Sequence, residues 1–294
     1  MMGCRLCPRR CGVERGRGER GFCGVSDEVR VARAALHVWE EPCISGERGS
    51  GTVFFSGCPL QCVFCQNREI ALGRSGKEIS VGRLSEIFLE LQDKGAHNIN
   101  LVTPTHFVPQ IVRALERARG QGLRLPVVYN TGSYERVDTL RRLEGIVDIY
   151  LPDLKYVDSG LSGRYSHAAD YFTWASLAIG EMVRQVGEAR FQGELMKQGV
   201  IVRHLVLPGC VEDSKAVIRY LYETYGDRVY LSIMNQFTPM GDPGQYPELN
   251  REVTQEEYDE VVDYAIELGV ENGFIQEGET AQESFIPAFD LEGV

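Results

Sequence analysis

The sequence predicts an α/β protein, a partial (β/α)6 TIM-type barrel preceded by a cysteine-rich, metal-binding N-terminal lobe. Eight of the nine cysteines lie within the first 65 residues. From residue 52 onwards, short apolar strands alternate with amphipathic helices, which is typical of a parallel sheet. Polar side chains follow most of these strands. We therefore expect a lobe and connector over residues 1–50 and a barrel over residues 51–294.

The composition is that of an ordinary globular protein, with 43% hydrophobic and 25% charged residues in a chain of 294. Many of the cysteines are two or three residues apart, and such close neighbours seldom form structural disulfides. The spacing favours metal binding in a reducing compartment. Because the chain shows no apolar leader and no run of about 18 apolar residues, we expect a cytoplasmic protein without a membrane partner.

The net charge of −11 is unevenly distributed along the chain. Residues 1–23 contain six arginines and two glutamates, whereas residues 240–294 contain fifteen acidic residues and one arginine. The acidic end argues against nonspecific binding of nucleic acid, so no nucleic-acid partner is expected. Its simplest interpretation is the solvated faces of helices.

The N-terminal segment is rich in Gly and Arg and has little periodicity. Four thiols within 20 residues can close a tetrahedral zinc site or carry a second iron–sulfur cluster. These thiols belong to Cys4, Cys7, Cys11 and Cys23. So small a lobe buries little core, so metal binding would supply its folding energy. Cys43 is an additional thiol, more often simply buried.

The predicted barrel contains six strands, each rich in Val, Ile and Leu as strands buried on both faces should be. They are 52–57, 98–104, 126–132, 148–154, 200–208 and 229–237. Helices are predicted at 81–95, 108–121, 135–144, roughly 160–187, 190–198, 212–225 and 254–269, the last with a capping box of Thr254 and Glu257. A closed eight-fold barrel takes about 250 residues, so six units favour a partial barrel. Residues 160–198 either line a substrate opening or form two ordinary packed helices.

The first strand leads directly into a loop with three cysteines. Gly57 ends the strand, and Cys58, Cys62 and Cys65 follow with C-x3-C-x2-C spacing. Three thiolates from one loop can hold three irons of a four-iron cluster and leave the fourth iron open for chemistry. The alternative is a set of three buried or zinc-binding cysteines.

Polar residues recur where the other strands end. Since the carboxyl ends of parallel strands share one edge, these side chains are expected to meet there. They are Thr103, Thr105 and His106; Asn130 and Thr131; Asp153 and Lys155; and Arg203. Taken alone, Asp153 and Lys155 are equally an exposed pair, and His106 is equally a buried structural histidine. His204 should point to the opposite face from Arg203.

The loop SGCPLQCVFCQN resembles the signature of the radical S-adenosylmethionine (SAM) superfamily, with Phe64 before the last cysteine. The version with Gln66 and Asn67 after that cysteine is similar to pyruvate formate-lyase activating enzymes. The resemblance implies a [4Fe-4S] cluster whose open iron chelates SAM. One electron then cleaves SAM and yields a 5′-deoxyadenosyl radical. An electron donor such as flavodoxin or ferredoxin is implied as a partner.

The same resemblance implies roles for the strand-end residues. Lys155 would bind the SAM carboxylate and Asp153 its polar groups. Asn130 and Thr131 are candidates for the ribose hydroxyls, and Arg203 for the SAM carboxylate or the substrate. The sequence departs from the family at TPTH, where a Gly-Gly-Glu stretch is usual. Backbone carbonyls of Thr103, Thr105 and His106 could still meet the cofactor.

A second resemblance to a known family covers nearly the whole chain. CxxCPxxCxxxR and GxCG, followed by EEPCISG, are similar to the PflX-type group of activating-enzyme homologues. A comparable cysteine lobe occurs in the AmmeMemoRadiSam group. The first function implied is hydrogen abstraction from a protein or peptide, as in a glycyl-radical activase. The second is the same chemistry on a small molecule, and the third is a non-catalytic metal-binding or electron-transfer protein.

Overall fold

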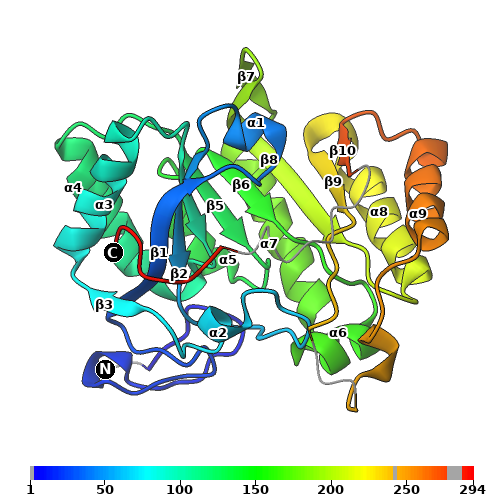
Figure 1. Cartoon of the computed structure of the whole chain (residues 1–294), viewed down its shortest axis with the longest axis horizontal. Helices are drawn as coiled ribbons and strands as arrows, with labels where there is room; N and C mark the ends of the chain where they lie inside the picture. The colour runs from blue at the N-terminus through cyan, green and yellow to red at the C-terminus, as the bar shows by residue number, and fades with distance from the viewer. Residues whose placement is uncertain (1–2, 241–243, 277–286) are drawn as a thin grey trace.

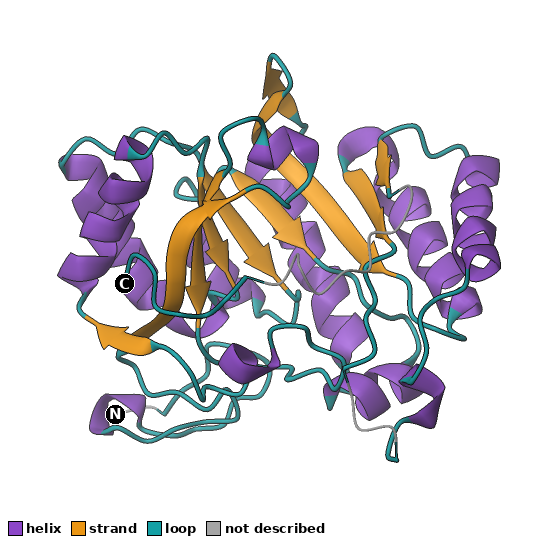
Figure 2. Ribbon diagram, in the orientation of Figure 1, coloured by secondary structure: helices purple, strands orange, loops and turns teal. Residues whose placement is uncertain are grey.

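The computed structural model describes residues 3–240, 244–276 and 287–294, and its centre is a single sheet of ten strands (Figures 1 and 2). Seven of these strands are parallel and lie in spatial order along the sheet. They are β2 (Ser50–Phe55), β4 (Ile99–Val102), β5 (Val127–Thr131), β6 (Ile149–Pro152), β8 (Leu195–Leu205), β9 (Tyr230–Met234) and β10 (Gly273–Ile275). The predicted parallel α/β sheet of a partial TIM-type barrel is thereby confirmed.

Helices cover the outer face of this sheet (Figure 2). The longer ones are α3 (Val81–Asp93), α4 (Val108–Gly120), α6 (Ser159–Ser166), α7 (Tyr171–Val186), α8 (Val211–Tyr225) and α9 (Gln255–Leu268). Single turns of α-helix form α1 (Pro42–Ser45), α2 (Arg68–Ala71) and α5 (Val137–Leu140), and 3-10 turns form η1 (Arg15–Arg17), η2 (Thr105–Phe107), η3 (Arg141–Leu143), η4 (Gly226–Arg228) and η5 (Pro247–Leu249). The predicted capping box of Thr254 and Glu257 begins α9.

Side chains alternate between the two faces of the parallel strands, as the pleat requires. Tyr129 and Val200 belong to the main core, which also contains the apolar stripes of the outer helices. Their strand neighbours Val128 and Ile201 pack instead in a second cluster with Cys43 and Ile44 of α1, and with Ile149, Leu151 and Met196. Because α1 packs at the amino ends of the strands, it closes that end of the barrel (Figure 1). Cys43 is therefore a buried packing residue.

The segment expected to be an irregular connector contains strand β1 (Val29–His37), which pairs antiparallel with β2. A short strand, β3 (Lys77–Ile79), pairs antiparallel with β1 at the edge of the sheet. The division of the chain at residue 50 stays a prediction, but this pairing joins residues 29–37 to the barrel sheet. The last described residues, 287–294, run along β1, where Arg33 forms ion pairs with Asp290 and Glu292.

The predicted helix over residues 190–198 is wrong. Strand β7 (Arg190–Gln192) folds back on the start of β8 as a hairpin, and Gly193 turns the chain with a φ of +62°. Glycine adopts this left-handed conformation without a steric penalty. The predicted helix over 160–187 is two helices, α6 and α7, because His167 takes a φ of +54° between them.

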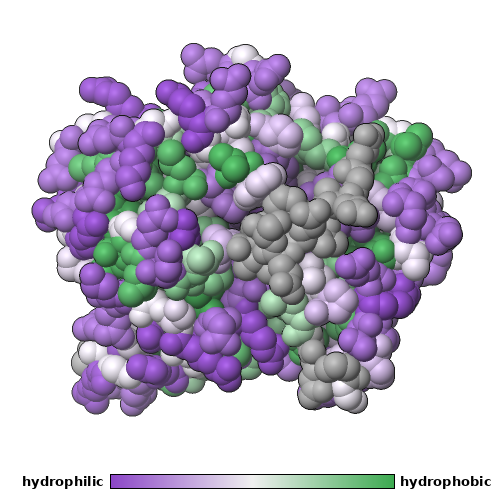
Figure 3. All heavy atoms as spheres, in the orientation of Figure 1, coloured by the Kyte–Doolittle hydropathy of each residue, from purple (hydrophilic) through white to green (hydrophobic). Residues whose placement is uncertain are grey.

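The N-terminal lobe lies at the carboxyl ends of the parallel strands, at the bottom of Figure 1. Arginine side chains attach it to the barrel by donating to backbone carbonyls. Arg9 Nε donates to Pro59 O at 2.8 Å, and Arg15 donates to the carbonyls of His106 and Ser26. The surface over this lobe is mostly hydrophilic in the view of Figure 3. Among the described residues, no helix is both long and apolar enough to span a membrane.

Replacing Thr254 with alanine should lower the free energy of unfolding by about 1 kcal/mol, because the side chain accepts the backbone N–H of Glu257 at 3.2 Å. Urea unfolding measures the change. Thr224→Ala is the matched control, since Thr224 is exposed in the last turn of α8 and caps nothing. Equal losses in both variants would contradict the assigned role of the cap.

Candidate functional site

A pocket of about 260 Å³ opens at the carboxyl ends of the parallel strands. It brings together the three cysteines of the loop after β2 and nearly every strand-end residue that the sequence singled out. The predicted residues lining it are Cys58, Cys62, Cys65, Gln66, Asn67, Thr103, Thr105, Asn130, Thr131, Asp153, Lys155 and Arg203. They come from the cysteine loop and from the ends of β4, β5, β6 and β8, so the sheet itself gathers them.

The cysteine loop is held in place from both sides. Gly57 turns the chain after β2 with a φ of +91°, and a Cβ there would lie 2.7 Å from the carbonyl oxygen of Cys23. Glycine is therefore required at this position. On the other side, Ser166 of α6 donates to Cys62 Sγ at 2.9 Å, and Val63 N donates to Tyr165 O. Residues 160–166 thus support the loop, whereas α7 packs as an ordinary outer helix.

The three thiols share a buried environment that disfavours negative charge. Burial, together with the neighbouring Cys62, raises the pKa of Cys58 to about 11. Burial and the other two cysteines raise the pKa of Cys65 to about 12, and burial also raises the pKa of Cys62. Three thiolates at one site therefore require cationic compensation, which a metal cluster supplies. The positive charge of Lys155 supplies part of this compensation, because it lowers the pKa of Cys62.

Within residues 3–240, 244–276 and 287–294, no group of three or more His, Cys, Asp and Glu side chains is gathered closely enough to hold a metal ion. A four-iron cluster separates its thiolates more widely than a single ion does, and three thiols facing one pocket suit such a cluster. Cys58, Cys62 and Cys65 therefore fit the donor set of a [4Fe-4S] cluster.

The four cysteines of the N-terminal lobe lie near one another but outside this pocket. Burial raises the pKa of Cys7 to about 12, and Cys23 and Cys4 are among the charges that raise it further. Burial also raises the pKa of Cys23, to which Cys4 and Cys11 contribute. The lobe thus clusters its thiols, and a zinc ion or second cluster there stays a prediction.

A network of buried charges forms part of the wall of the same pocket. Arg203 Nε donates to Asp153 Oδ1 at 3.0 Å, its Nη1 to Glu40 Oε2 at 3.1 Å and its Nη2 to Asn130 Oδ1 at 2.6 Å. Lys155 Nζ donates to Asp153 Oδ2 at 2.7 Å. Two cations and two carboxylates from three segments of the chain thus alternate in the order Glu40, Arg203, Asp153 and Lys155.

These contacts keep the network ionised. Burial opposes the charge on Asp153, but Lys155 and Arg203 outweigh it and lower the pKa of Asp153 below its usual range. Burial likewise opposes the charge on Lys155, yet the Asp153 carboxylate raises the pKa of Lys155. A zwitterion entering the pocket would therefore meet both fixed positive and fixed negative groups.

Glu135 anchors the hydroxyl groups at the ends of β4 and β5. Its Oε1 accepts from Thr105 Oγ1 at 2.6 Å, Thr131 Oγ1 at 2.7 Å and Tyr129 Oη at 3.1 Å, while Oε2 has no partner among the described residues. The side chain is fully buried. Burial raises the pKa of Glu135 to about 7, although the three hydroxyls act against this shift.

Thr103 introduces backbone strain where the chain leaves β4. Its φ is +57°, which is rare for a β-branched residue, and its N–H donates to Asn130 O at 2.9 Å. Such strain clusters at binding and catalytic sites. On the opposite side, Gln66 Nε2 donates to Gln236 O at 2.7 Å, which links the cysteine loop to the end of β9.

His106 does not line the pocket, contrary to the expectation from its position after β4. The turn at Thr103 directs the chain towards the N-terminal lobe, and His106 Nε2 pairs with the carbonyl of Ser56 at 2.8 Å. Burial, with a contribution from Arg15, lowers the pKa of His106 to about 3. His204 lies on the outer face as expected, between Leu154 O and Ser214 Oγ.

Two residues of the site could not be found by sequence reasoning. Glu40 precedes α1 and enters the barrel, where it also accepts from Asn100 Nδ2 at 2.9 Å. Its only signal is that it is the first residue of the EEPCISG motif. Glu135 is an acidic residue five positions after Asn130, a signal too weak to assign. Cys210 lies outside the pocket, before α8.

The three cysteines and the charge network lie at the carboxyl edge of a partial parallel barrel, which is the edge where barrel enzymes place their active sites. Residues 52–172 match the family model described as Radical SAM superfamily, and this stretch contains the cysteine loop and the ends of β4, β5 and β6. A curated relative, the uncharacterized protein MJ0674 of Methanocaldococcus jannaschii, is 29% identical over 271 residues, which cover 89% of this chain and 74% of the relative.

Several solved structures have a similar fold. The HydG maturase of the FeFe-hydrogenase from Carboxydothermus hydrogenoformans superposes with a TM-score of 0.53 at 12% identity, over 80% of this chain and 56% of HydG. Methylornithine synthase (PylB) gives 0.52 at 16%, over 80% and 66%. SuiB of Streptococcus suis, bound to SAM, gives 0.50 at 14%, over 76% and 49%. The chain thus spans about half to two thirds of these proteins, and the likeness establishes the fold.

Glu135→Gln should remove a pH dependence of stability. Because folding raises the pKa of Glu135 from 4.5 to about 7, the folded state binds the proton more tightly. The stability of the wild type should therefore fall, relative to the variant, by about 3 kcal/mol as the pH rises from 4.5 through 7. Urea unfolding of both proteins across this range provides the measurement, and parallel curves would contradict the assignment.

Arg203→Met should lower the free energy of unfolding by about 3 kcal/mol or more, because it leaves the buried carboxylate of Glu40 without its cation. The double variant Arg203→Met/Glu40→Gln removes both charges and should lose less than the single variant. A double-mutant cycle by urea unfolding measures this coupling. A double variant that loses the sum of the two single losses would show that the charges do not interact.

Proposed function

We propose that this protein is a radical SAM oxidoreductase related to activating enzymes of the PflX-type group, and that it abstracts hydrogen from a protein or peptide substrate. The observation that carries the proposal is the pocket that Cys58, Cys62 and Cys65 share with the Arg203 network. When bound, a [4Fe-4S] cluster supplies one electron that cleaves SAM to methionine and a 5′-deoxyadenosyl radical, which takes a hydrogen atom from the substrate. A glycine of a partner protein is the favoured target.

The chain contributes binding and orientation rather than acid–base chemistry. Lys155 and Arg203 present positive charge to the SAM carboxylate, and Asp153 and Glu40 present negative charge to its ammonium group. These groups now satisfy one another, so binding would exchange internal ion pairs for pairs with the zwitterion. Because exchange conserves the number of charge pairs, the site need not leave a buried charge unpaired when SAM enters.

The polar residues of β4 and β5 fit the ribose. Asn130, Thr105 and Thr131 line the pocket, and Glu135 fixes the two threonine hydroxyls from behind. The strained backbone at Thr103 turns a peptide group at the same edge, where a carbonyl can meet the SAM ammonium group. Gln66 and Asn67 lie beside Cys65 and complete the wall.

Electrons would come from a flavodoxin or ferredoxin, the usual one-electron donors of such enzymes. The N-terminal lobe lies beside the cysteine loop, to which Gln61 Nε2 joins it by donating to Phe22 O at 2.7 Å. A second cluster held by Cys4, Cys7, Cys11 and Cys23 would therefore be close to the first in the fold, whereas a zinc ion there would be structural.

A second candidate is the same chemistry on a small molecule. The observation in its favour is that the lobe packs against the cysteine loop, beside the pocket, through Arg9 and Gln61. Rapid formation of 5′-deoxyadenosine, together with a modified small metabolite and no protein partner, would favour this candidate.

The test is anaerobic reconstitution of wild type and Cys62→Ala, followed by dithionite and SAM. We expect the wild type to bind about four irons and to form 5′-deoxyadenosine, and Cys62→Ala to lose both. About eight irons would place a second cluster in the lobe, and about one zinc would make the lobe structural. Iron and zinc are counted by elemental analysis, and 5′-deoxyadenosine by chromatography.

The matched control is Cys43→Ala, which removes a buried thiol at the opposite end of the barrel. It should keep both the iron content and the cleavage of SAM. Retained cleavage in Cys62→Ala would eliminate the radical mechanism. Iron binding without any 5′-deoxyadenosine in the wild type would leave a metal-binding or electron-transfer protein as the better description.

A further inference from the structure

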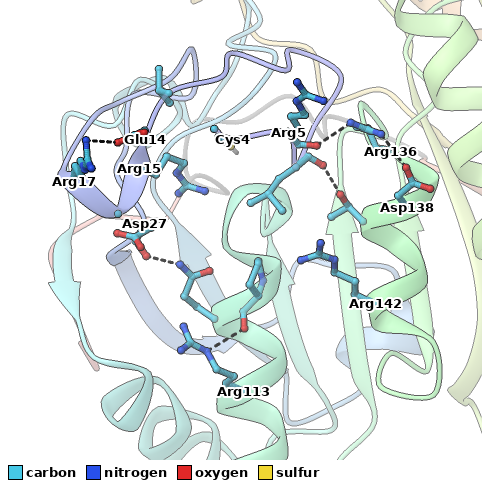
Figure 4. Close-up of a pocket in the computed structure, with 17 residues that line it drawn as sticks. Cys4, Arg5, Glu14, Arg15, Arg17, Asp27, Arg113, Arg136, Asp138 and Arg142 are labelled. Carbon is cyan, nitrogen blue, oxygen red and sulfur yellow. Dashed lines mark hydrogen bonds and ion pairs between the residues drawn. The ribbon is translucent and has the colours of Figure 1, made fainter. Parts of the chain in front are cut away.

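A second and larger hollow, of about 710 Å³, lies between the N-terminal lobe and the outer helical layer, away from the candidate site (Figure 4). The lobe contributes residues 3–6, 13–17 and Asp27, and the barrel contributes the first turns of α4 with residues of α5 and η3. Hollows of this size commonly bind small organic ligands. The lining of this hollow includes no strand end and none of Cys58, Cys62 and Cys65, which line the candidate site.

Arginine is the dominant residue of this hollow. Six arginines line it against three acidic residues, in a chain whose net charge is −11. The arginines are Arg5, Arg15, Arg17, Arg113, Arg136 and Arg142. Figure 4 shows Arg113 and Arg142 on the barrel side and Arg15 and Arg17 on the lobe side. Positive charge is therefore concentrated here against the trend of the whole molecule.

Ion pairs within the hollow neutralise only part of this charge. Glu14 pairs with Arg17 at 2.8 Å, and Asp138 pairs with Arg136 at 2.8 Å. In the described part of the chain, no carboxylate pairs with Arg5, Arg113 or Arg142. Among the acidic residues that line the hollow, only Asp27 is left to offset the positive charge of these three arginines. Like charges that gather without compensation repel one another, and an anion between them would relieve that repulsion.

Arg15 contributes a buried positive charge to the hollow. Its side chain is only 6% exposed, and it donates to the carbonyls of Ser26 and His106 rather than to a carboxylate. Its Nε has no partner among the described residues. A guanidinium buried without a counter-ion contributes a full positive charge in a region of low dielectric.

The remaining walls include the apolar side chains of Leu6, Val13 and Pro109, together with the polar Gln110 and Thr139 and with Cys4. A ligand must therefore combine negative charge for the guanidinium groups with an organic body for these walls. Guanidinium groups match phosphate oxygens geometrically, through paired N–H donors. We propose that this arginine hollow binds a small organic phosphate that carries at least two negative charges. This proposal goes beyond the radical chemistry and does not depend on it.

The test is calorimetric titration of the full chain, prepared anaerobically at low ionic strength, with pyrophosphate and with ATP. The variant is Arg113→Gln/Arg142→Gln, since both side chains are exposed and form no ion pair with described residues, so their loss should leave folding intact. We expect one saturable site in the wild type and binding at least about tenfold weaker in the variant, the loss of about one charge-assisted contact.

The matched control is Arg124→Gln/Arg190→Gln, which removes the same charge from two exposed arginines outside the hollow. It should bind pyrophosphate like the wild type. Equal weakening in the control would reduce the effect to general surface charge and overturn the proposal. Absence of saturable binding would overturn it as well, and tricarballylate binding as tightly as pyrophosphate would overturn the assignment to phosphate. Circular dichroism of each variant verifies the fold.

Discussion

The buried guanidinium of Arg203 is the constraint on which the architecture of the barrel interior depends. A cation inside a curved sheet must find acceptors on every side, because desolvation without compensation costs several kcal/mol. Asp153 on the neighbouring strand supplies one acceptor and Asn130, one strand further, another. The third, Glu40, lies 163 residues away in sequence. The segment between β1 and α1 therefore has to enter the barrel.

That requirement explains the path of the N-terminal half. Strand β1 carries the chain from the carboxyl edge, where the lobe lies, to the amino edge, where α1 closes the barrel. Only then can β2 run in the parallel direction and deliver the cysteine loop to the same edge as Lys155 and Asp153. The antiparallel pairing of β1 and β2 thus allows Glu40 to enter the barrel interior and the cysteine loop to follow at the carboxyl edge.

Much of the site was predictable because parallel strands end at one edge and side chains alternate along each strand. These two rules placed Arg203 inward, His204 outward and Asp153 beside Lys155. They fail where the chain leaves a strand early. The strand β4 ends at Val102, and the left-handed turn at Thr103 directs His106 behind the pocket, which no local pattern reveals.

Contacts between residues far apart in the sequence could not be predicted from local sequence patterns either. Glu40 sits in a segment whose composition marks only a connector, and Glu135 becomes an anchor only when β4 and β5 are adjacent. Polar and apolar residues alternate only weakly over residues 190–198, so this segment fits either a helix or a hairpin. The antiparallel pairing of β7 with β8 makes it a hairpin. Tertiary contacts, rather than propensity, resolve each of these cases.

The lobe depends on polar contacts more than on apolar burial. Arg9 and Arg15 donate to carbonyls of the barrel, Gln61 donates to Phe22 O, and Thr139 Oγ1 donates to Leu6 O at 2.6 Å. Directional bonds of this kind fix orientation more sharply than non-directional apolar contact does. Because two of them end on Pro59 and Gln61, within the cysteine loop itself, a shift of the lobe must move that loop. The arrangement of thiols in the lobe and the geometry of the pocket are therefore mechanically linked.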